Sequence, residues 1–473
     1  MKIGICADRE DFFYDLHSLV KSFFPDDDVS VFSQKEYEER GGEYDLMIRV
    51  EIPLYDPSLR KEAKDALKRK LYESLRDYLG RDLPWGMLSG IRPVRIPLKV
   101  LRDGGSLKEA GRVLLRENFV SPKKTELAVR IASKEKAILE RLPIGEKSYS
   151  LYVHIPFCPS ICLYCTFSSS PISLWEKRAD GYLDAVVREM HVRHDAMMKE
   201  GWNKGPTTVY IGGGTPTSLA AAQLDRLLFR IEEIWDLTGT LEYTVEAGRP
   251  DSFSADKLRV LKNHGVTRIS VNPQTMNDST LELIGRRHTA KDTVRAFHMA
   301  RGAGFDNINM DIILGLPGEG EEEVRRTCEE IIALGPDSLT VHSLAVNRAS
   351  RLKLNILEDR MKDGDMADRG DFRGYSLENS GEIMDIASDA AERMGMEPYY
   401  LYRQKNMRGN LENTGFASPG RECLYNILIM EELETIAAFG AAASTKRVYP
   451  DGRIERSISP KDVKTYLERM ENL

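Results

Sequence analysis

The sequence predicts an α/β protein built on a parallel sheet, with more than one domain. Two observations predict this class. From residue 147 onward, short apolar segments alternate with helical segments in six successive repeats, a pattern typical of strand–helix units with right-handed crossovers. The chain has 473 residues, which is more than a single hydrophobic core usually supports. The repeat pattern alone fits an open barrel and a doubly wound sheet equally well.

The first part of the chain, residues 1–145, predicts a small N-terminal α/β domain. Apolar segments predict strands at residues 2–6, 29–32 and 46–52. Charged, periodic segments predict helices at residues 57–79, 107–118 and 122–142. Pro143 and Gly145 then predict a boundary, because both residues interrupt regular structure.

The six repeats fill a second predicted domain, residues 146–347. Its strands are expected at residues 148–155, 207–211, 242–246, 268–272, 308–314 and 338–344. Its helices are expected at residues 175–199, 220–235, 254–264, 289–302 and 319–334. Beyond these repeats the pattern becomes irregular, so residues 348–473 are interpreted as an irregular C-terminal extension that covers one side of the site.

The composition is that of a globular enzyme, with 41% hydrophobic and 30% charged residues. The formal net charge of −7 gives no reason to expect nucleic acid or an anionic membrane as the main partner. No segment has the run of about eighteen apolar residues that a membrane-spanning helix needs, and the N-terminus does not resemble a signal peptide. We therefore expect a cytoplasmic protein, in which clustered cysteines indicate a metal site rather than disulfides.

Three of the six cysteines lie close together, as Cys158, Cys162 and Cys165. Thiolates bind zinc or iron–sulfur clusters. A four-iron cluster with three protein thiolates leaves one iron open, where S-adenosylmethionine (SAM) can bind and be cleaved to a deoxyadenosyl radical. The alternatives are a chance grouping and a zinc site with His154 as the fourth ligand. The Cys-x3-Cys-x2-Cys spacing, directly after the first strand of the repeats, favours the cluster.

Other unusual polar or glycine-rich groups also follow predicted strands. Parallel strands bring their carboxyl ends to one edge, where α/β proteins bind their ligands, so these groups should converge. Taken singly, a triple glycine is as typical of a tight turn, and each polar residue is more typical of the surface or of a helix cap. Together they predict a pocket for SAM, in which the backbone of Gly212, Gly213, Gly214 and Thr215 contacts the methionyl end. Its ribose hydroxyls and carboxylate would be bound by Glu246, Gln274, Arg286 and Asp311.

Several motifs together resemble one known family. Tyr-x-His-Ile-Pro-Phe begins at Tyr152, Gly-Gly-Gly-Thr-Pro-Thr at Gly212, Arg-Ile-Ser at Arg268 and Asp-Ile-Ile-Leu-Gly-Leu-Pro-Gly at Asp311. With the cysteine spacing, they resemble the coproporphyrinogen dehydrogenase branch of the radical SAM superfamily, which includes the HemN, HemW and HemZ types. The HemZ type is the most similar, and the likeness extends over nearly the whole chain.

The resemblance implies a partial (β/α)6 barrel that binds a [4Fe–4S] cluster and SAM. Cys158, Cys162 and Cys165 would be the cluster ligands and, with Tyr152, the catalytic residues. The SAM pocket that it implies comprises Tyr152, Phe167, Gly213, Gly214, Thr215, Glu246, Gln274, Arg286, Asp311 and Ala345.

The implied reaction is the oxidative decarboxylation of two propionates of coproporphyrinogen III to vinyl groups, which gives protoporphyrinogen IX. The radical would take hydrogen from the propionate β-carbon, carbon dioxide would leave, and an acceptor would collect the remaining electron. The implied partners are a tetrapyrrole and an electron donor such as flavodoxin or ferredoxin.

One residue departs from the pattern of the HemN type. Phe167 stands where that type has a further cysteine, a feature shared with HemW-like relatives, which resemble haem-binding chaperones. A haem-binding or haem-transfer protein is therefore an alternative function. A radical methyltransferase and a haem-ring-opening enzyme on the same scaffold are further alternatives.

A substrate with four carboxylates needs arginines or lysines near the site. The candidates are Arg249 and Arg287 on the barrel rim, and Arg403, Lys405 and Arg408 on the C-terminal extension. Each of these, taken singly, is more typical of solvated surface charge. Because aromatic and basic residues alternate over residues 399–413, we interpret that segment as a substrate lid.

Overall fold

The computed structural model describes residues 1–25, 27–90, 92–346, 350–356, 371–372, 375–377, 379–404 and 410–472. Its largest sheet has eleven strands, and the six strands predicted from the repeats form the centre of it. Each of the six agrees with its prediction to within two residues. They are β4 (Tyr149–Ile155), β7 (Thr208–Gly213), β8 (Glu242–Gly248), β9 (Arg268–Val271), β10 (Ile308–Leu314) and β11 (Ser338–Ser343).

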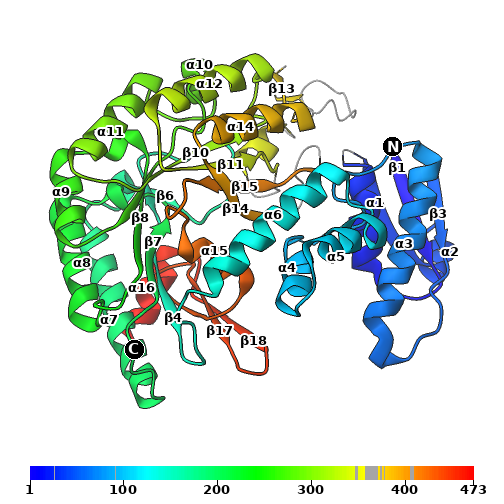
Figure 1. Cartoon of the computed structure of the whole chain (residues 1–473), viewed down its shortest axis with the longest axis horizontal. Coiled ribbons are helices and arrows are strands. Elements are labelled where there is room, and N and C mark those ends of the chain that lie inside the picture. Colours follow the sequence, from blue (N-terminus) through cyan, green and yellow to red (C-terminus); the bar gives the residue numbers. More distant parts are fainter. Residues whose placement is uncertain are drawn as a thin grey trace.

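The order of these strands decides between the two architectures that the sequence allowed. A doubly wound sheet reverses its strand order, whereas this sheet runs β4-β7-β8-β9-β10-β11 without a reversal, and all five pairs are parallel. The connecting helices form an outer arc around the strands (Figure 1). The fold is therefore the expected partial (β/α)6 barrel.

The helices of the arc also follow the predicted pattern, with two differences. The first helix begins four residues later than expected, because residues 175–178 form a turn, and the short α10 was not expected. The arc comprises α7 (Ala179–Lys199), α8 (Ala221–Ile234), α9 (Ala255–Asn263), α10 (Asp278–Leu283), α11 (Ala290–Gly302) and α12 (Glu321–Leu334).

Successive side chains of each strand point alternately to the apolar core under the outer helices and to the polar interior of the barrel. In β7, Val209 and Ile211 join the apolar core against the outer helices, whereas Tyr210 between them lines an inner cavity. Glu246 and Asp311 point inward by the same alternation from β8 and β10. None of the helices in the described residues has the length and apolar character to cross a membrane.

The C-terminal extension is more regular than its sequence indicates. β15 (Asn413–Ala417) pairs antiparallel with β11, and β16 (Thr435–Phe439) pairs parallel with β4, so the extension adds strands at both edges of the barrel sheet. These pairings join residues far apart in the chain, which local periodicity does not reveal. The other described elements are β12 (Asp371–Phe372), β13 (Tyr375–Ser376), β14 (Glu397–Tyr402), β17 (Ser444–Val448), β18 (Ile454–Ile458), α14 (Gly381–Arg393), α15 (Leu424–Glu431) and α16 (Val463–Glu471).

The N-terminal residues lie beside the barrel (Figure 1) and contain two small hydrophobic cores. One core surrounds a parallel sheet of order β2-β1-β3, and the other surrounds Trp85 and extends to Leu401 of β14. The first core holds β1 (Lys2–Ala7), β2 (Asp28–Ser33), β3 (Leu46–Val50), α1 (Phe13–Phe23) and α3 (Arg60–Leu79), and α2 (Gln34–Arg40) packs beside β1 and β2. The second holds α4 (Arg95–Arg102), α5 (Leu107–Arg112) and α6 (Pro122–Leu139). The domain boundaries after residues 145 and 347 stay a proposal, and residues 347 and 348 lie outside the described residues.

Candidate active site

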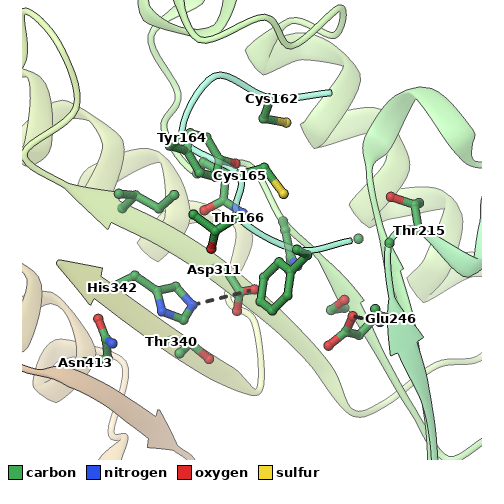
Figure 2. A pocket seen from close by; sticks show the side chains of 18 of the residues that line it. Cys162, Tyr164, Cys165, Thr166, Thr215, Glu246, Asp311, Thr340, His342 and Asn413 are labelled. Carbon is green, nitrogen blue, oxygen red and sulfur yellow. Dashed lines mark hydrogen bonds and ion pairs between the residues drawn. The ribbon is translucent and has the colours of Figure 1, made fainter. Parts of the chain in front are cut away.

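A cavity of about 400 Å³ lies at the carboxyl ends of the barrel strands. All the residues that the sequence proposed for the cluster and the SAM pocket line this one cavity, as their positions after the strands led us to expect, except Gly212, which is not among the lining residues. Figure 2 shows part of its lining, with the cysteine loop above the strand ends. The residues concerned are Tyr152, Cys158, Cys162, Cys165, Phe167, Gly213, Gly214, Thr215, Glu246, Gln274, Arg286, Asp311 and Ala345.

The three cysteines lie on a loop that short parallel strands close. β5 (Phe157–Cys158) pairs with β6 (Ser170–Pro171), so the two ends of the loop that contains the cysteines lie side by side. The hydroxyl of Thr215 lies 3.5 Å from the Sγ of Cys158. Burial raises the pKa of Cys158 to about 11. A metal centre would displace the thiol protons, since only the thiolate is a metal ligand.

Arg249 ties this loop to the barrel. Its guanidinium donates to the Sγ of Cys162 at 3.3 Å and to the hydroxyl of Ser160 at 3.1 Å. The same group forms two hydrogen bonds, of 2.9 Å and 2.7 Å, with the carboxylate of Asp251. Because its donors are taken, Arg249 positions the cysteine loop and is not available to a substrate carboxylate, contrary to the expectation from the sequence.

The glycine motif lies against the first strand so closely that side chains would not fit. A Cβ on Gly213, which has φ +102°, would lie 2.4 Å from the ring of His154, and one on Gly214 would lie 2.6 Å from the carbonyl of Phe157. Each of these two residues must therefore be glycine. Both glycines also line the cavity, so their backbone atoms are available to a ligand there.

His154 is not placed to complete a zinc site. One ring nitrogen lies 3.2 Å from the hydroxyl of Tyr152 and the other 3.4 Å from the carbonyl of Ser168. In the described part of the chain, no group of three or more His, Cys, Asp or Glu side chains is arranged to hold a single metal ion. A four-iron cluster does not need that arrangement, because each thiolate binds a different iron.

Glu246 sits in the wall opposite the cysteine loop. Tyr210 donates a hydrogen bond of 2.5 Å to its Oε1, and the amide of Gly213 donates one of 3.2 Å to its Oε2. Burial raises the pKa of Glu246 to about 6, although the hydrogen bond from Tyr210 opposes this shift. Tyr425 stacks on Tyr210 with ring centroids 4.4 Å apart and shields this wall from water.

Asp311 forms a second acidic position with neighbours that the sequence did not single out. The Nε2 of His342 lies 3.9 Å from its Oδ2, as the dashed line in Figure 2 marks, and Asn309 donates a hydrogen bond of 2.6 Å to its Oδ1. Burial alone would raise the pKa of Asp311, but the hydrogen bonds and charge of His342 and the hydrogen bond from Asn309 outweigh burial and lower it. The cavity therefore presents an ionised carboxylate here. His342, Tyr402 and Asn413 also line it, and strand alternation was the only sequence signal for His342.

Several buried polar atoms of the lining have no hydrogen-bond partner among the described residues. They include donors, which suit a carboxylate, and acceptors, which suit hydroxyl or ammonium groups. Leaving such groups unpaired is costly, so their convergence indicates that the cavity is built for a polar ligand. The atoms are the Nε of Arg268, the Nε of Arg286, the Oε1 of Gln274, the Oδ1 of Asn272 and the Nδ2 of Asn413.

Of the expected substrate cations, Arg249 lines this cavity, whereas Arg287 and Arg403 are not among its lining residues. Arg403 donates to the carbonyls of Leu88 and Leu411 and to Asn410, so the protein itself uses it. Arg287 is exposed and lines a different cavity. Lys405 and Arg408 lie outside the described residues. Of the segment 399–413, Tyr400, Tyr402, Gln404 and Asn413 line the cavity, but β14 is a strand of the main sheet and not a lid.

Comparisons with known proteins agree with this geometry. Residues 152–331 match the radical SAM superfamily. The oxygen-independent coproporphyrinogen-III oxidase-like protein HemZ of Bacillus subtilis is 38% identical over 414 residues, which cover 87% of this chain and 80% of HemZ. The heme chaperone HemW of the same organism is 34% identical over 295 residues, 62% of this chain and 70% of HemW.

A solved structure has a similar fold. Coproporphyrinogen III oxidase (HemN) from Escherichia coli, described as a radical SAM enzyme, superposes with a TM-score of 0.52 at 22% identity. The match covers 71% of this chain and 72% of HemN.

Proposed function

Because the chain belongs to the radical SAM superfamily, in the family of HemN, HemW and HemZ, we propose that it oxidatively decarboxylates coproporphyrinogen III to protoporphyrinogen IX. One observation carries this proposal. The cavity that holds the three thiols also holds two buried guanidinium groups, Arg268 and Arg286, whose Nε atoms have no hydrogen-bond partner among the described residues. A propionate is the kind of group that these donors bind.

The family uses a [4Fe–4S] cluster and SAM, and the residues present fit both. When bound, these cofactors supply a deoxyadenosyl radical. Cys158, Cys162 and Cys165 would hold the cluster, and Arg249 would keep Cys162 in place through the contact at 3.3 Å. The backbone of Gly213 and Gly214 would lie against the ligand, where no side chain intervenes.

The acidic and basic groups of the cavity would orient the ligand by binding different parts of it. Ionised Glu246 would accept hydrogen bonds from ribose hydroxyls, and Asp311 would face a positive group of the ligand. Arg286 would bind a carboxylate through its free Nε while its Nη1 holds the carbonyl of Asn272. The stacked rings of Tyr210 and Tyr425 would exclude water from the reacting centre.

The size of the cavity limits how the substrate enters. Its volume of about 400 Å³ is near the lower end of small-molecule sites, which run from about 300 to 1,000 Å³. SAM would occupy most of that space. A tetrapyrrole would therefore insert one propionate arm while its ring stays at the mouth, where Phe167 is 70% exposed.

A second candidate function is haem binding or transfer, as the name of HemW describes for that relative. Two observations favour it. Arg249 and Arg403 are engaged within the protein, which leaves fewer cations for a substrate with four carboxylates. Phe167 occupies the position where the resemblance to the HemN type implies a cysteine.

Turnover separates the two functions. The anaerobically reconstituted chain is incubated with dithionite, SAM and coproporphyrinogen III, and carbon dioxide, protoporphyrinogen IX and 5′-deoxyadenosine are quantified. The proposal expects all three products. Stoichiometric haem binding without any release of carbon dioxide would instead establish the chaperone function.

A further inference from the structure

The helix α15 brings two residues of the C-terminal extension, Asn426 and Met430, to the wall of the active-site cavity. Its N-terminal end receives no hydrogen bond from the side chain of Cys423, the residue that precedes it. The first amides of a helix have no partner within the helix, so they need an acceptor from elsewhere when they are buried. In this helix the acceptor comes from the barrel.

The carboxylate of Glu242, at the start of β8 and 182 residues before Leu424, supplies that acceptor. Its Oε2 accepts a hydrogen bond of 2.7 Å from the amide of Leu424, and its Oε1 accepts one of 3.3 Å from the amide of Tyr425. The thiol of Cys423 donates to the same Oε1 at 3.3 Å. Glu242 is buried, and the helix dipole also favours a carboxylate at this end. One side chain of the barrel therefore fixes where α15 begins.

Tyr425, the second residue of α15, connects this helix to the SAM pocket. Its ring stacks on those of Tyr210 and Tyr152, with centroids 4.4 Å and 6.1 Å away. Tyr152 and Tyr210 also stack on each other, with centroids 6.1 Å apart. Within this group of three rings, the hydroxyl of Tyr210 donates its hydrogen bond of 2.5 Å to Glu246. The ring of Tyr425 therefore restrains the side chain that orients Glu246.

Glu242 lies behind the cavity and is not part of its wall. Glu242, Thr244 and Glu246 share one face of β8, because successive strand residues point to opposite faces. Thr244 donates a hydrogen bond of 3.1 Å to Glu242. Of these three described residues, Glu246 alone lines the cavity. Glu242 can therefore influence a ligand through its charge or through the position of α15, but not by contact.

We infer that Glu242 is a positioning residue for SAM: by capping α15 it holds Tyr425 on Tyr210, which keeps the carboxylate of Glu246 oriented towards the ribose. The contacts run from the start of β8, through the C-terminal extension, back to the end of the same strand. The extension thus takes part in SAM binding, whereas its sequence indicated only a cover for one side of the site. This inference rests on the proposed function, in which Glu246 binds the ribose hydroxyls.

Calorimetric titration of SAM into the anaerobically reconstituted, oxidised chain tests the inference without turnover. Glu242→Gln keeps the shape of the side chain but turns an NH2 group towards one of the two amides, so SAM should bind about tenfold more weakly at pH 7.5. The midpoint of the pH dependence of SAM affinity, about 6 in the wild type, should rise by at least about half a pH unit, because the hydrogen bond from Tyr210 lowers the pKa of Glu246. Loss of the negative charge alone would lower that pKa. A midpoint at or below the wild-type value would therefore overturn the inference.

A double-mutant cycle shows whether Glu242 acts through Tyr425. Tyr425→Leu removes the ring and should cause the same two changes, and its midpoint alone decides the question if Glu242→Gln does not fold. The double variant Glu242→Gln/Tyr425→Leu should bind SAM about as weakly as either single variant, because both substitutions break the same chain of contacts. An additive loss of about a hundredfold in the double variant would overturn the inference.

Ser254→Ala is the matched control for a lost helix cap. The hydroxyl of Ser254 accepts a hydrogen bond of 3.3 Å from the amide of Lys257 at the start of α9, on the outer arc. The variant should melt at a lower temperature but keep the wild-type SAM affinity and midpoint. A tenfold loss of SAM affinity in this control would overturn the inference, because the loss of any helix cap would then have the same effect.

A measurement without SAM separates a failure of this inference from a failure of the proposed function. Urea denaturation compares the chain with its Glu246→Gln variant, and the pH above which their difference in free energy of unfolding becomes constant reports the pKa of Glu246. This pH should be higher when both proteins also carry Glu242→Gln, and an equal or lower pH would overturn the inference. No SAM binding by the wild type would overturn the proposed function, while the denaturation would still decide whether Glu242 positions Glu246.

Discussion

The indole of Trp85 donates a hydrogen bond of 2.7 Å to the carboxylate of Glu412, 327 residues further along the chain. The Nζ of Lys124 lies 2.5 Å from the other oxygen of that carboxylate, and Glu412 is 1% exposed. The carbonyl of Glu412 accepts a hydrogen bond of 2.9 Å from the hydroxyl of Ser343, and the next residue, Asn413, lines the active-site cavity. The N-terminal residues therefore fix one wall of the site.

Removing this carboxylate should destabilise the protein strongly. Glu412→Ala leaves Lys124 buried without its counter-ion, so the free energy of unfolding should fall by about 3–5 kcal/mol. Urea denaturation of the apo-protein measures this change. Glu392→Ala, which removes the partner of Arg130 from an exposed ion pair, should change the free energy of unfolding by no more than about 1 kcal/mol. Equal effects of the two substitutions on the free energy of unfolding would show that the buried ion pair of Glu412 and Lys124 stabilises the protein no more than an exposed ion pair does.

The glycine motif should tolerate no side chain. Gly213→Ala places a Cβ 2.4 Å from the ring of His154 at a φ of +102°, so we expect loss of SAM binding and a lower melting temperature. Gly181, in the first turn of α7, has open space around its Cβ position, and Gly181→Ala should stabilise the protein by up to about 1 kcal/mol. Calorimetric titration with SAM and thermal melts check both variants. Wild-type SAM affinity in Gly213→Ala would contradict the assignment of this surface to SAM.

SAM affinity should depend on the protonation of Glu246. Burial raises the pKa of this carboxyl to about 6, and only the ionised form can accept hydrogen bonds from ribose hydroxyls on both oxygens. Affinity should therefore be constant above pH 6 and fall about tenfold for each pH unit below it. Titrations between pH 5 and 7 measure the effect. Glu246→Gln should bind SAM more weakly and without this dependence, and an identical pH profile in the two proteins would exclude Glu246 as the titrating group.

Protein stability should respond to a different carboxyl, Glu434. It accepts hydrogen bonds from Ser150 and Thr207 beneath β4, and burial raises its pKa to about 7. A carboxyl whose pKa is higher in the folded state holds its proton more tightly there, so the contribution of Glu434 to stability is fully present below about pH 4.5 and is lost as the pH rises through about 7.

The variant Glu434→Gln has no ionisable group at this position, so comparing it with the wild type isolates the contribution of Glu434 to the pH dependence of stability. The wild-type free energy of unfolding, relative to that of the variant, should fall by up to about 3 kcal/mol between pH 4.5 and 7.5. Urea denaturation of both proteins at several pH values gives the difference. A difference that is constant with pH would show that the carboxyl is ionised throughout.

The sequence was most informative where structure is local. Strand–helix repeats predicted the six barrel strands to within two residues, because each repeat carries its own alternation and helical period. The placement of polar residues after these strands predicted the convergence of the cysteines, Glu246 and Asp311 on one cavity. Long-range pairing was not accessible in the same way. Nothing in residues 435–439 indicates that they pair with β4, and nothing around Trp85 indicates its bond to Glu412.

Side-chain partners were the other gap in the sequence-based account. Arg249 and Arg403 were both proposed as substrate ligands because arginine suits carboxylates. In the structure Arg249 holds Cys162 and Asp251, and Arg403 holds backbone carbonyls. The type of a residue limits which groups its side chain can bind, but the fold determines which of those groups lie within its reach.

Release of 5′-deoxyadenosine from SAM, after reduction of the anaerobically reconstituted chain, tests the central claim most directly. The account predicts that the wild type releases it, and that Cys158→Ser, Cys162→Ser and Cys165→Ser do not. Cys6→Ser, whose buried thiol in β1 contacts Gln34, should behave as wild type. A wild-type chain that contains zinc in place of iron and sulfide, and releases no 5′-deoxyadenosine, would contradict the account.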